Sequence, residues 1–285
     1  MRVLLTGAKG QLGQSLSNHM PSDWIVLAAD KIFLDIANEQ NVYDVISYFK
    51  PDVVINTAAF TSVDDAEKNI DVSKQVNFLG AKYVAQAAKK YGAKLIHVST
   101  DYVFDGKSTV PYSEEDKVKS LNVYGSTKHL GELAVLENHS DAIVIRTSWV
   151  YSEYGKNFLR TIFNFVQRNK DVKVVFDQIG APTYAPDIAK LIIDIIKANS
   201  LKPGIYHYSG DTVMSWYDFA QKIAEAVIFS HSKVESISSA EYKAVAERPS
   251  YSVLNCDKIE KLGYKRSCFT NGFNQSISAL IEKSK

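Results

Sequence analysis

A tyrosine and a lysine stand four residues apart in the stretch Tyr124-Gly125-Ser126-Thr127-Lys128. On a helix, positions i and i+4 lie on one face, so the ammonium group would stand near the phenol. A nearby ammonium lowers the pKa of a phenol from its usual value near ~10, which suits it to proton transfer near neutral pH. The pair therefore predicts acid–base chemistry, and the spacing alone also fits an ordinary helix-surface pair.

Thr100 is a third candidate group because it follows a predicted strand at residues 94–99. Parallel sheets bind their ligands at the carboxyl ends of their strands. There the Thr100 hydroxyl could hydrogen-bond a carbonyl oxygen, while Tyr124 protonates it and Lys128 assists electrostatically. Together these groups predict the reduction of a carbonyl group by hydride from a nicotinamide cofactor.

Three glycines form the pattern G-x-x-G-x-x-G at Gly7, Gly10 and Gly13, directly after the first predicted strand. Glycine permits a tight turn and a close approach to a pyrophosphate, and a helix N-terminus attracts anions. The pattern indicates a dinucleotide-binding turn, and its spacing does not fit a P-loop. The alternative is a strand–helix turn with chance glycines, which is rare for a chain with 14 glycines.

Two adjacent residues give opposite indications about the cofactor. Asp30 ends the second predicted strand, where a carboxylate can accept hydrogen bonds from the adenosine ribose, as in NAD sites. Lys31 follows it and could instead attract the 2′-phosphate of NADP. The choice between NADH and NADPH stays open at this stage.

The elements that must hold these residues alternate along the first half of the chain. Short apolar runs predict strands at residues 2–6, 24–29, 52–56, 94–99 and 142–146. Helical patterns lie between them at residues 11–19, 39–49, 72–91 and 124–137. This alternation predicts a parallel sheet with helices on both faces.

The second half has a less regular pattern. We expect helices at residues 157–168, 187–198 and 215–227 and strands at residues 172–176 and 205–208. Ser215 is the expected N-cap of the last helix, with Asp218 at its third position. These patterns predict a cofactor-binding domain at residues 1–150 and a smaller sugar-nucleotide-binding lobe at residues 151–285, with later segments crossing back.

Composition narrows the classes of partner. The 285 residues include 33 Lys and Arg against 32 Asp and Glu, so the net charge is +1. Such a balance favours neither nucleic acid nor an anionic membrane as a partner. The two cysteines, Cys256 and Cys268, do not make a disulfide framework, and no apolar run is long enough for a membrane span. We therefore expect a cytoplasmic protein.

Taken in order, G-x-x-G-x-x-G, residues 99–106 (STDYVFDG) and Y-x-x-x-K resemble the extended short-chain dehydrogenase/reductase family. Residues 55–67, 146–151, 177–183 and 248–252 narrow the resemblance to the dTDP-4-dehydrorhamnose reductases within that family. The resemblance implies an α/β fold, with a Rossmann-type doubly wound parallel sheet and a smaller C-terminal substrate-binding lobe. It also implies that NADPH or NADH reduces the C4 ketone of dTDP-4-dehydro-L-rhamnose, the last step of dTDP-L-rhamnose synthesis.

The resemblance also implies roles for individual residues. Tyr124 would donate the proton, Lys128 would hold the nicotinamide ribose and Thr100 would orient the reacting oxygen. The implied cofactor site comprises Gly7, Gly10, Gln11, Leu12, Gly13, Asp30, Asp35, Ile36, Ala59, Phe60, Thr61, Tyr124 and Lys128. The implied sugar pocket comprises Val63, Thr100, Asp101 and Trp149. Core packing is the alternative for Trp149, and a loop acid before a helix is the alternative for Asp35.

The diphosphate of a sugar nucleotide needs positive charge. Arg248 is the main candidate, with Lys156 and Asn157 as weaker ones, and a salt bridge between the lobes is the alternative for Arg248. No cluster of His, Cys, Asp and Glu indicates a metal. Ser15 stands where some relatives carry a glutamate linked to a metal-assisted dimer, so the formation of a metal-assisted dimer stays open.

Other functions are possible for a chain with these motifs. A dehydratase of the superfamily typically has Asp-Glu after the threonine, whereas here Tyr102 follows Asp101, so the second carboxylate is missing. An epimerase, or a reductase of another nucleotide 4-keto-6-deoxy sugar, stays open. So does a non-catalytic protein like the regulatory subunits of methionine adenosyltransferase, although the complete set of Thr100, Tyr124 and Lys128 favours catalysis. The role of Asn255, where the family more often has Asp, and a homodimer also stay open.

Overall fold

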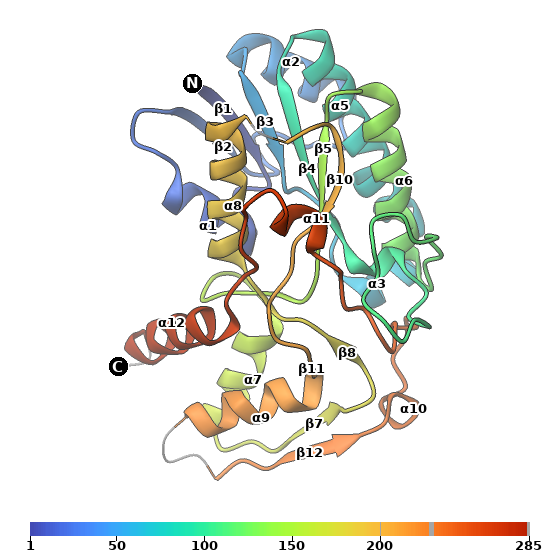
Figure 1. The fold of residues 1–285 in the computed structure, drawn as a ribbon, viewed down its shortest axis with the longest axis vertical. Coiled ribbons are helices and arrows are strands. Elements are labelled where there is room, and N and C mark those ends of the chain that lie inside the picture. The colour runs from blue at the N-terminus through green and yellow to red at the C-terminus, as the bar shows by residue number, and fades with distance from the viewer. Residues whose placement is uncertain (200, 228–230, 284–285) are drawn as a thin grey trace.

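A computed structural model of the chain describes residues 1–199, 201–227 and 231–283. Its largest feature is a six-stranded parallel sheet in the order β10-β5-β4-β3-β1-β2 (Figure 1). The strands are β1 (Arg2–Thr6), β2 (Ile25–Ala29), β3 (Val53–Asn56), β4 (Lys94–Thr100), β5 (Ile143–Thr147) and β10 (Gly204–His207). The first strand lies inside the sheet and later strands add on both sides, which confirms the doubly wound parallel sheet.

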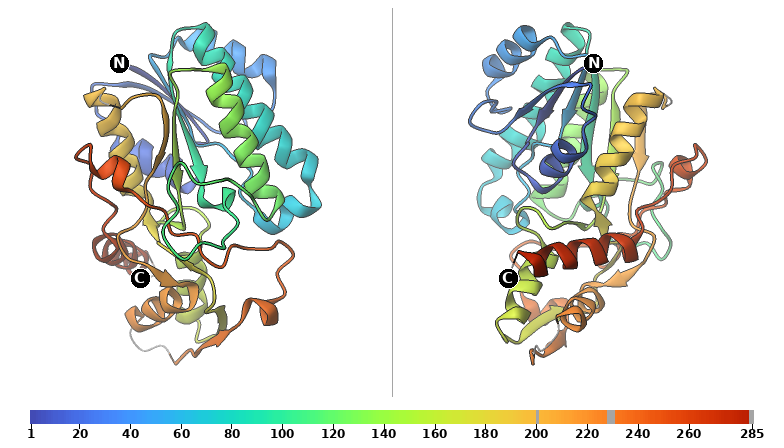
Figure 2. Two further views of the ribbon diagram at one scale, coloured as in Figure 1. Left: turned by 45° about the vertical axis from the view of Figure 1, so that its right-hand side comes forward. Right: turned by 90° about the vertical axis from the view of Figure 1, so that its left-hand side faces the viewer.

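Helices cover both faces of this sheet (Figures 1 and 2). The face with α1 (Gln11–His19) and α8 (Ala185–Ala198) buries Val3 and Leu5 of β1. The other face, with α2 (Glu39–Phe49), α5 (Ala81–Lys90) and α6 (Val123–Asn138), buries Leu4. Successive strand side chains point to opposite faces, so a strand covered on both sides must be apolar throughout. That is why the short apolar runs predicted these strands correctly.

One predicted helix differs in its interior. Residues 72–91 were expected to form a single helix, and they form α4 (Ile70–Lys74), the π-helical turn η1 (Gln75–Gly80) and α5 in succession. The preceding α3 (Val63–Lys68) was not expected. A π-helical turn inserts one residue into a helix and is common at functional sites. Here η1 carries the buried Asn77, whose contacts are described below.

A second lobe packs below the carboxyl ends of the strands (Figure 1). It contains α7 (Phe158–Gln167), α9 (Trp216–Ala226) and α12 (Phe269–Glu282), with β7 (Val172–Val175) and β12 (Val234–Ile237) paired in parallel. Its own core includes the buried rings of Phe163 and Phe219. The capping box of Ser215 and Asp218 at α9 is confirmed, with the Asp218 backbone N–H donating to the Ser215 hydroxyl at 3.0 Å.

The chain returns from the second half to the sheet. Helix α8 packs on α1, and β10 pairs with β5, so both elements lie with the first lobe. The domain boundary at residue 150 stays a prediction. The remaining short elements are η2 (Asp101–Val103), β6 (Val150–Tyr151), β8 (Ile179–Gly180), β9 (Thr183–Tyr184), β11 (Met214–Ser215), α10 (Ser239–Tyr242) and α11 (Asp257–Glu260).

Helix α12 was not predicted from the sequence, although the spacing of its apolar residues indicates a helix. Phe269, Phe273, Ile277 and Leu280 recur at helical spacing. They pack into the core of the second lobe, beside α9. Within the described residues, no helix combines the length and the apolar character needed to cross a membrane.

Candidate active site

A cavity of about 740 Å³ lies at the carboxyl ends of the strands, bordered by both lobes. Most of the predicted site residues line it. These are Gly7, Gly10, Gln11, Leu12, Gly13, Asp30, Asp35, Ile36, Ala59, Thr61, Val63, Thr100, Asp101, Tyr124, Lys128 and Trp149. Phe60 and Arg248 are outside the lining that the structure describes.

One end of the cavity is the glycine turn between β1 and α1. Gly7 has φ +69°, and a Cβ at Gly13 would overlap the carbonyl oxygen of Gly7. Only glycine fits both positions, so the turn stays tight. Gly10 is the N-cap of α1 and offers no side-chain cap. The first-turn N–H groups of this nine-residue helix are therefore available for an anion in the cavity.

Asp30 stands beside this turn, at the end of β2. Its carboxylate pairs with the ammonium of Lys9 and accepts hydrogen bonds from the backbone N–H of Ile32 at 3.0 Å and of Phe33 at 3.1 Å. The hydrogen bond to Lys9 is the largest of the effects that lower the Asp30 pKa. Lys9 and Lys31 both line the cavity, so a carboxylate and two ammonium groups share this corner.

The loop after β3 is held by the π-helical turn. The Phe60 backbone N–H donates to Asn77 Oδ1 at 2.8 Å, and Asn77 Nδ2 donates to the Phe60 carbonyl at 3.1 Å. Asn77 Nδ2 also lies 3.1 Å from Thr127 Oγ1 on α6. Phe60 is thus the fixed point of the loop, while its neighbours Ala59 and Thr61 line the cavity.

The Tyr–Lys pair lies in the first two turns of α6. Asn122 caps this helix, accepting from the Gly125 N–H at 2.8 Å. A Cβ at Gly125 would overlap the carbonyl oxygen of Tyr102, so the helix start packs directly on the backbone after β4. This contact brings the Tyr124 phenol close to the Thr100 hydroxyl. The structure therefore brings the three predicted catalytic residues to one wall of the cavity.

Burial raises the Tyr124 pKa to about 12, although the nearby Thr100 hydroxyl acts in the opposite direction. The expectation that the nearby lysine would lower it was therefore wrong in direction. The reason is that desolvation disfavours the phenolate more than its polar neighbours favour it. Burial likewise lowers the Lys128 pKa to about 8, opposed by the negative charge of Glu132.

Asp101 follows Thr100 and is buried in the cavity wall. The Thr100 hydroxyl donates to its Oδ1 at 3.1 Å. Burial raises the Asp101 pKa to about 6, while the hydroxyls of Ser252 and Thr100 act to lower it. The carboxyl group can thus change its charge within the physiological range.

The wall facing the second lobe is aromatic. Trp149 stacks on Trp216 with ring centroids 3.5 Å apart and planes 4° apart. Trp149 has φ +47°, an unusual backbone conformation that turns the chain between β5 and β6. Its ring lies against Gly180, where a Cβ would overlap it. Trp149 is therefore packed as the alternative interpretation expected, and it also lines the cavity.

Arg248 lies at the edge of the site. Its Nη2 donates to Asp64 Oδ2 of α3 at 2.7 Å, and its Nη1 donates to the Ala246 carbonyl at 3.1 Å. This is the geometry of the alternative interpretation, a salt bridge between segments far apart in the chain. Lys156 lines the cavity, whereas Asn157 caps α7 and accepts from the Arg160 N–H at 3.0 Å.

Several lining residues were not predicted from the sequence, including Lys9, Tyr102 and Trp216. Lys9 could have been placed at the cavity from the sequence, because it lies inside the glycine pattern. Trp216 could not, because its position depends on how the second lobe packs. Among the residues described, no group of His, Cys, Asp and Glu side chains is arranged to hold a metal ion.

The chain is similar to known proteins over nearly its whole length. A family model described as the RmlD substrate binding domain matches residues 1–282. A dTDP-4-dehydrorhamnose reductase of Aggregatibacter actinomycetemcomitans is 42% identical over 271 residues, covering 91% of this chain and 92% of the relative. The chain belongs to the dTDP-4-dehydrorhamnose reductase family. The match over residues 1–282 spans both lobes and the range of the chain that lines the cavity.

Solved structures of the dTDP-4-dehydrorhamnose reductase family have the same fold. A reductase of Clostridium acetobutylicum superimposes with a TM-score of 0.93 at 35% identity, covering 98% of this chain and 99% of the other. A reductase of Bacillus anthracis, crystallised in complex with NADP, has a TM-score of 0.90 at 35% identity, with 99% of both chains covered. Both lobes therefore have counterparts in this reductase family.

Proposed function

We propose that this chain is an NAD(P)H-dependent reductase that converts the C4 ketone of dTDP-4-dehydro-L-rhamnose to the alcohol of dTDP-L-rhamnose. The observation that carries the proposal is the convergence of Thr100, Tyr124 and Lys128 on one wall of a cavity that ends at a glycine turn. The family membership supports the substrate, because its named members are dTDP-4-dehydrorhamnose reductases.

The residues present fit a nicotinamide dinucleotide. The uncapped N-terminus of α1 and the tight glycine turn would hold the pyrophosphate, and Asp30 would accept from the adenosine ribose. Lys9 neutralises Asp30, and Lys31 adds a second cation, which supports acceptance of a 2′-phosphate as well. When bound, the cofactor supplies a hydride to the ketone carbon.

The protein supplies the proton. Because the Tyr124 pKa is about 12, the phenol is protonated at neutral pH and can donate to the more basic oxygen of the reduced ketone. Lys128, one helical turn away, places a positive charge near the phenolate that results. The Thr100 hydroxyl, which lies close to Tyr124, orients the reacting oxygen. Hydride to carbon and proton to oxygen complete the conversion of ketone to alcohol.

The sugar and its diphosphate would occupy the part of the cavity nearest the second lobe. Val63, Trp149 and Trp216 offer apolar contacts to the deoxysugar, and Asp101 can hydrogen-bond its hydroxyl groups. Lys156, a cation that lines the cavity, would meet the diphosphate, whereas the guanidinium of Arg248 is committed to Asp64.

The Tyr124→Phe variant tests the proposal. We expect it to bind NADPH as tightly as the natural chain, followed by quenching of tryptophan fluorescence, and to lose about 100-fold or more of kcat, because general acid catalysis contributes that much. Turnover is measured as NADPH oxidation on adding the dTDP-4-keto sugar. Near-natural turnover in the variant, or no oxidation by the natural chain with either cofactor, would contradict the proposal.

A homodimer and a cytoplasmic location belong to the same proposal. The outward faces of α4 and α6 expose Val72 and Leu133, each about half accessible, and these apolar groups support contact with a second copy. Sedimentation of the purified chain tests the dimer.

The proposed location is supported by the free cysteines Cys256 and Cys268, which suit a reducing compartment. Fractionation of cells tests the location.

A further inference from the structure

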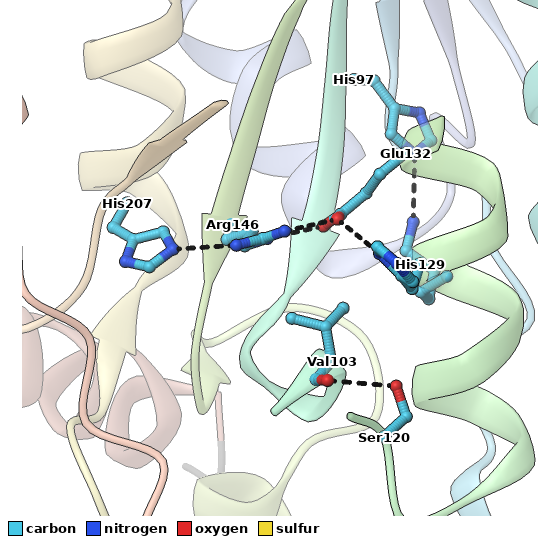
Figure 3. A network of polar contacts seen from close by, with 8 residues as sticks. His97, Val103, Ser120, His129, Glu132, Arg146 and His207 are labelled. Carbon is cyan, nitrogen blue, oxygen red and sulfur yellow. Dashed lines mark hydrogen bonds and ion pairs between the residues drawn. The ribbon is translucent and has the colours of Figure 1, made fainter. Parts of the chain in front are cut away.

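A buried ion pair lies beneath the Tyr–Lys helix. Glu132 of α6 accepts from Arg146 Nε at 2.8 Å and from Arg146 Nη2 at 2.7 Å, a two-point contact between α6 and β5 (Figure 3). Glu132 is 0% exposed and Arg146 is 1% exposed. Both charges are therefore fully removed from water, at a position one helical turn beyond Lys128.

The pair is the centre of a larger polar cluster. Arg146 Nη1 lies 3.4 Å from His207 Nε2 on β10, and His129 Nδ1 lies 3.3 Å from Glu132 Oε2 (Figure 3). On the other side, Lys128 Nζ donates to the Val98 carbonyl at 2.7 Å and lies 3.5 Å from His97 Nε2. Side chains from one helix and three strands thus meet under the cavity.

Fold stability is a weak reason for such a pair. Replacing a buried ion pair with apolar residues of similar volume is often neutral or stabilising, because the desolvation of both charges offsets their attraction. A different reason comes from the charge of Lys128 itself, on which Glu132 acts. The titratable or charged groups of this cluster are His129 and Glu132 of α6, His97 of β4, Arg146 of β5 and His207 of β10, while Tyr124 and Asp101 line the cavity together with Lys128.

Among these groups Glu132 is the carboxylate that shares the buried cluster with Lys128. His97 and His207 are neutral, because burial holds the pKa of each well below its usual value. Burial alone would raise the Glu132 pKa, but hydrogen bonds from Arg146 and His129 lower it to about 2, so it is ionised. Without Glu132 the cluster would hold two buried cations, Lys128 and Arg146, and no anion.

We propose that Glu132, held by Arg146, is a positioning residue of the reaction that keeps Lys128 as an ammonium at the floor of the cavity. The inference rests on the proposed function only for the role of Lys128 in turnover. Arg146 has the task of holding Glu132 in its ionised form and in its rotamer, through two hydrogen bonds that leave both carboxylate oxygens occupied.

The decisive experiment is the titration of Lys128 in the chain without cofactor. The ¹³Cε resonance of Lys128, assigned with Lys128→Met, reports the charge of the amine directly. We expect a midpoint near about 8 in the natural chain and a fall of at least about one pH unit in Glu132→Gln. The control is Glu137→Gln, an exposed substitution on the same helix, which we expect to leave the midpoint unchanged.

Turnover gives the second measurement. A lysine is charged below its pKa, so a lower pKa moves the alkaline limb of the kcat profile to lower pH. Glu132→Gln should lose about 10-fold of kcat at pH 8.5 relative to the natural chain while losing much less at pH 6.5. An equal loss at both pH values would indicate a merely structural effect and would overturn the proposal.

Two further results keep the inference separable from misfolding and from the proposed function. If Glu132→Gln does not fold, the variant Glu132→Gln/Arg146→Met removes both charges, and its Lys128 midpoint should still lie below that of the natural chain. A midpoint equal to the natural one overturns the proposal. If Lys128→Met turns over normally, the role of Lys128 in the proposed function fails, whereas the titration still decides what Glu132 does.

Discussion

At the residue scale, burial changes the pKa of Tyr124 and of Asp101 in the same direction but with different consequences. Burial raises the pKa of both groups, to about 12 for the phenol and to about 6 for the carboxyl. Tyr124 is therefore fully protonated at neutral pH and can act as a proton donor. The ionised Asp101 carboxylate instead lowers the free energy of unfolding, because the ionised form is less favoured in the folded chain than in the unfolded one.

We predict that Asp101→Asn stabilises the chain above about pH 6. An acid whose folded pKa is raised binds more protons when folded, so stability falls as pH rises between about 4 and 6. Above that window the variant should gain up to about 3 kcal/mol, and near pH 4 the gain should vanish. Urea unfolding across pH 4–8 measures this. Asp105→Asn is the control: backbone and Tyr112 hydrogen bonds lower the Asp105 pKa, so no gain is expected.

At the scale of elements, the start of α6 decides whether Tyr124 reaches Thr100. Its backbone packs directly on the carbonyl of Tyr102, a contact that only Gly125 permits. A second glycine, Gly131, approaches the carbonyl of Asn77 in the same way. The Tyr–Lys helix is thus placed by two backbone-to-backbone contacts on neighbouring elements, and small displacements of it would move both reactive groups.

We predict that Gly125→Ala destabilises the chain and impairs turnover. Helix propensity favours alanine by about 1 kcal/mol, but the overlap with a backbone oxygen should cost about 1–3 kcal/mol and push the helix away. Urea unfolding and kcat measure the two effects. Ser126→Ala, at the exposed next position, has the propensity gain without the overlap. Equal behaviour of the two variants would show that the close contact does not matter.

At the scale of the whole molecule, the segment after α10 connects the two lobes across the edge of the cavity. Arg248 pairs with Asp64 of α3, the Ala246 N–H donates to Asp64 Oδ1 at 3.0 Å, and Asn122 Nδ2 donates to the Glu247 carbonyl at 2.8 Å. Val63 and Tyr102 beside this connection line the cavity. Loss of the connection should therefore affect the sugar end of the cavity more than the cofactor end.

We predict that Asp64→Ala and Arg248→Ala raise KM for the nucleotide sugar by similar factors and leave the NADPH Kd unchanged. The double variant should raise KM for the nucleotide sugar no more than either single variant does. This corresponds to a coupling energy of about 1 kcal/mol between the two side chains of this partly exposed pair. Steady-state kinetics of all three measure it. Lys173→Ala, which breaks an exposed ion pair with Glu235, should change nothing. A far larger loss for Arg248→Ala than for Asp64→Ala would instead assign Arg248 to the diphosphate.

The sequence by itself determined the parallel sheet, the glycine turn and the Tyr–Lys helix. Their signals are local: strands covered on both faces are apolar at every position, and a helix repeats every three to four residues. Ser215 and Asp218 gave the start of α9 for the same reason. The helix α12 was predictable from the spacing of Phe269, Phe273, Ile277 and Leu280, and was missed.

Only the tertiary structure decided what these residues meet. The pairing of Arg248 with Asp64, of Lys9 with Asp30 and of Glu132 with Arg146 joins segments separated by up to 184 residues, and no local pattern encodes such an approach. The direction of the Tyr124 pKa shift was mispredicted because burial, which depends on every packed element, outweighs the polar neighbours. Local periodicity determines where helices and strands form. Long-range packing determines which distant residues come into contact and how their pKa values shift.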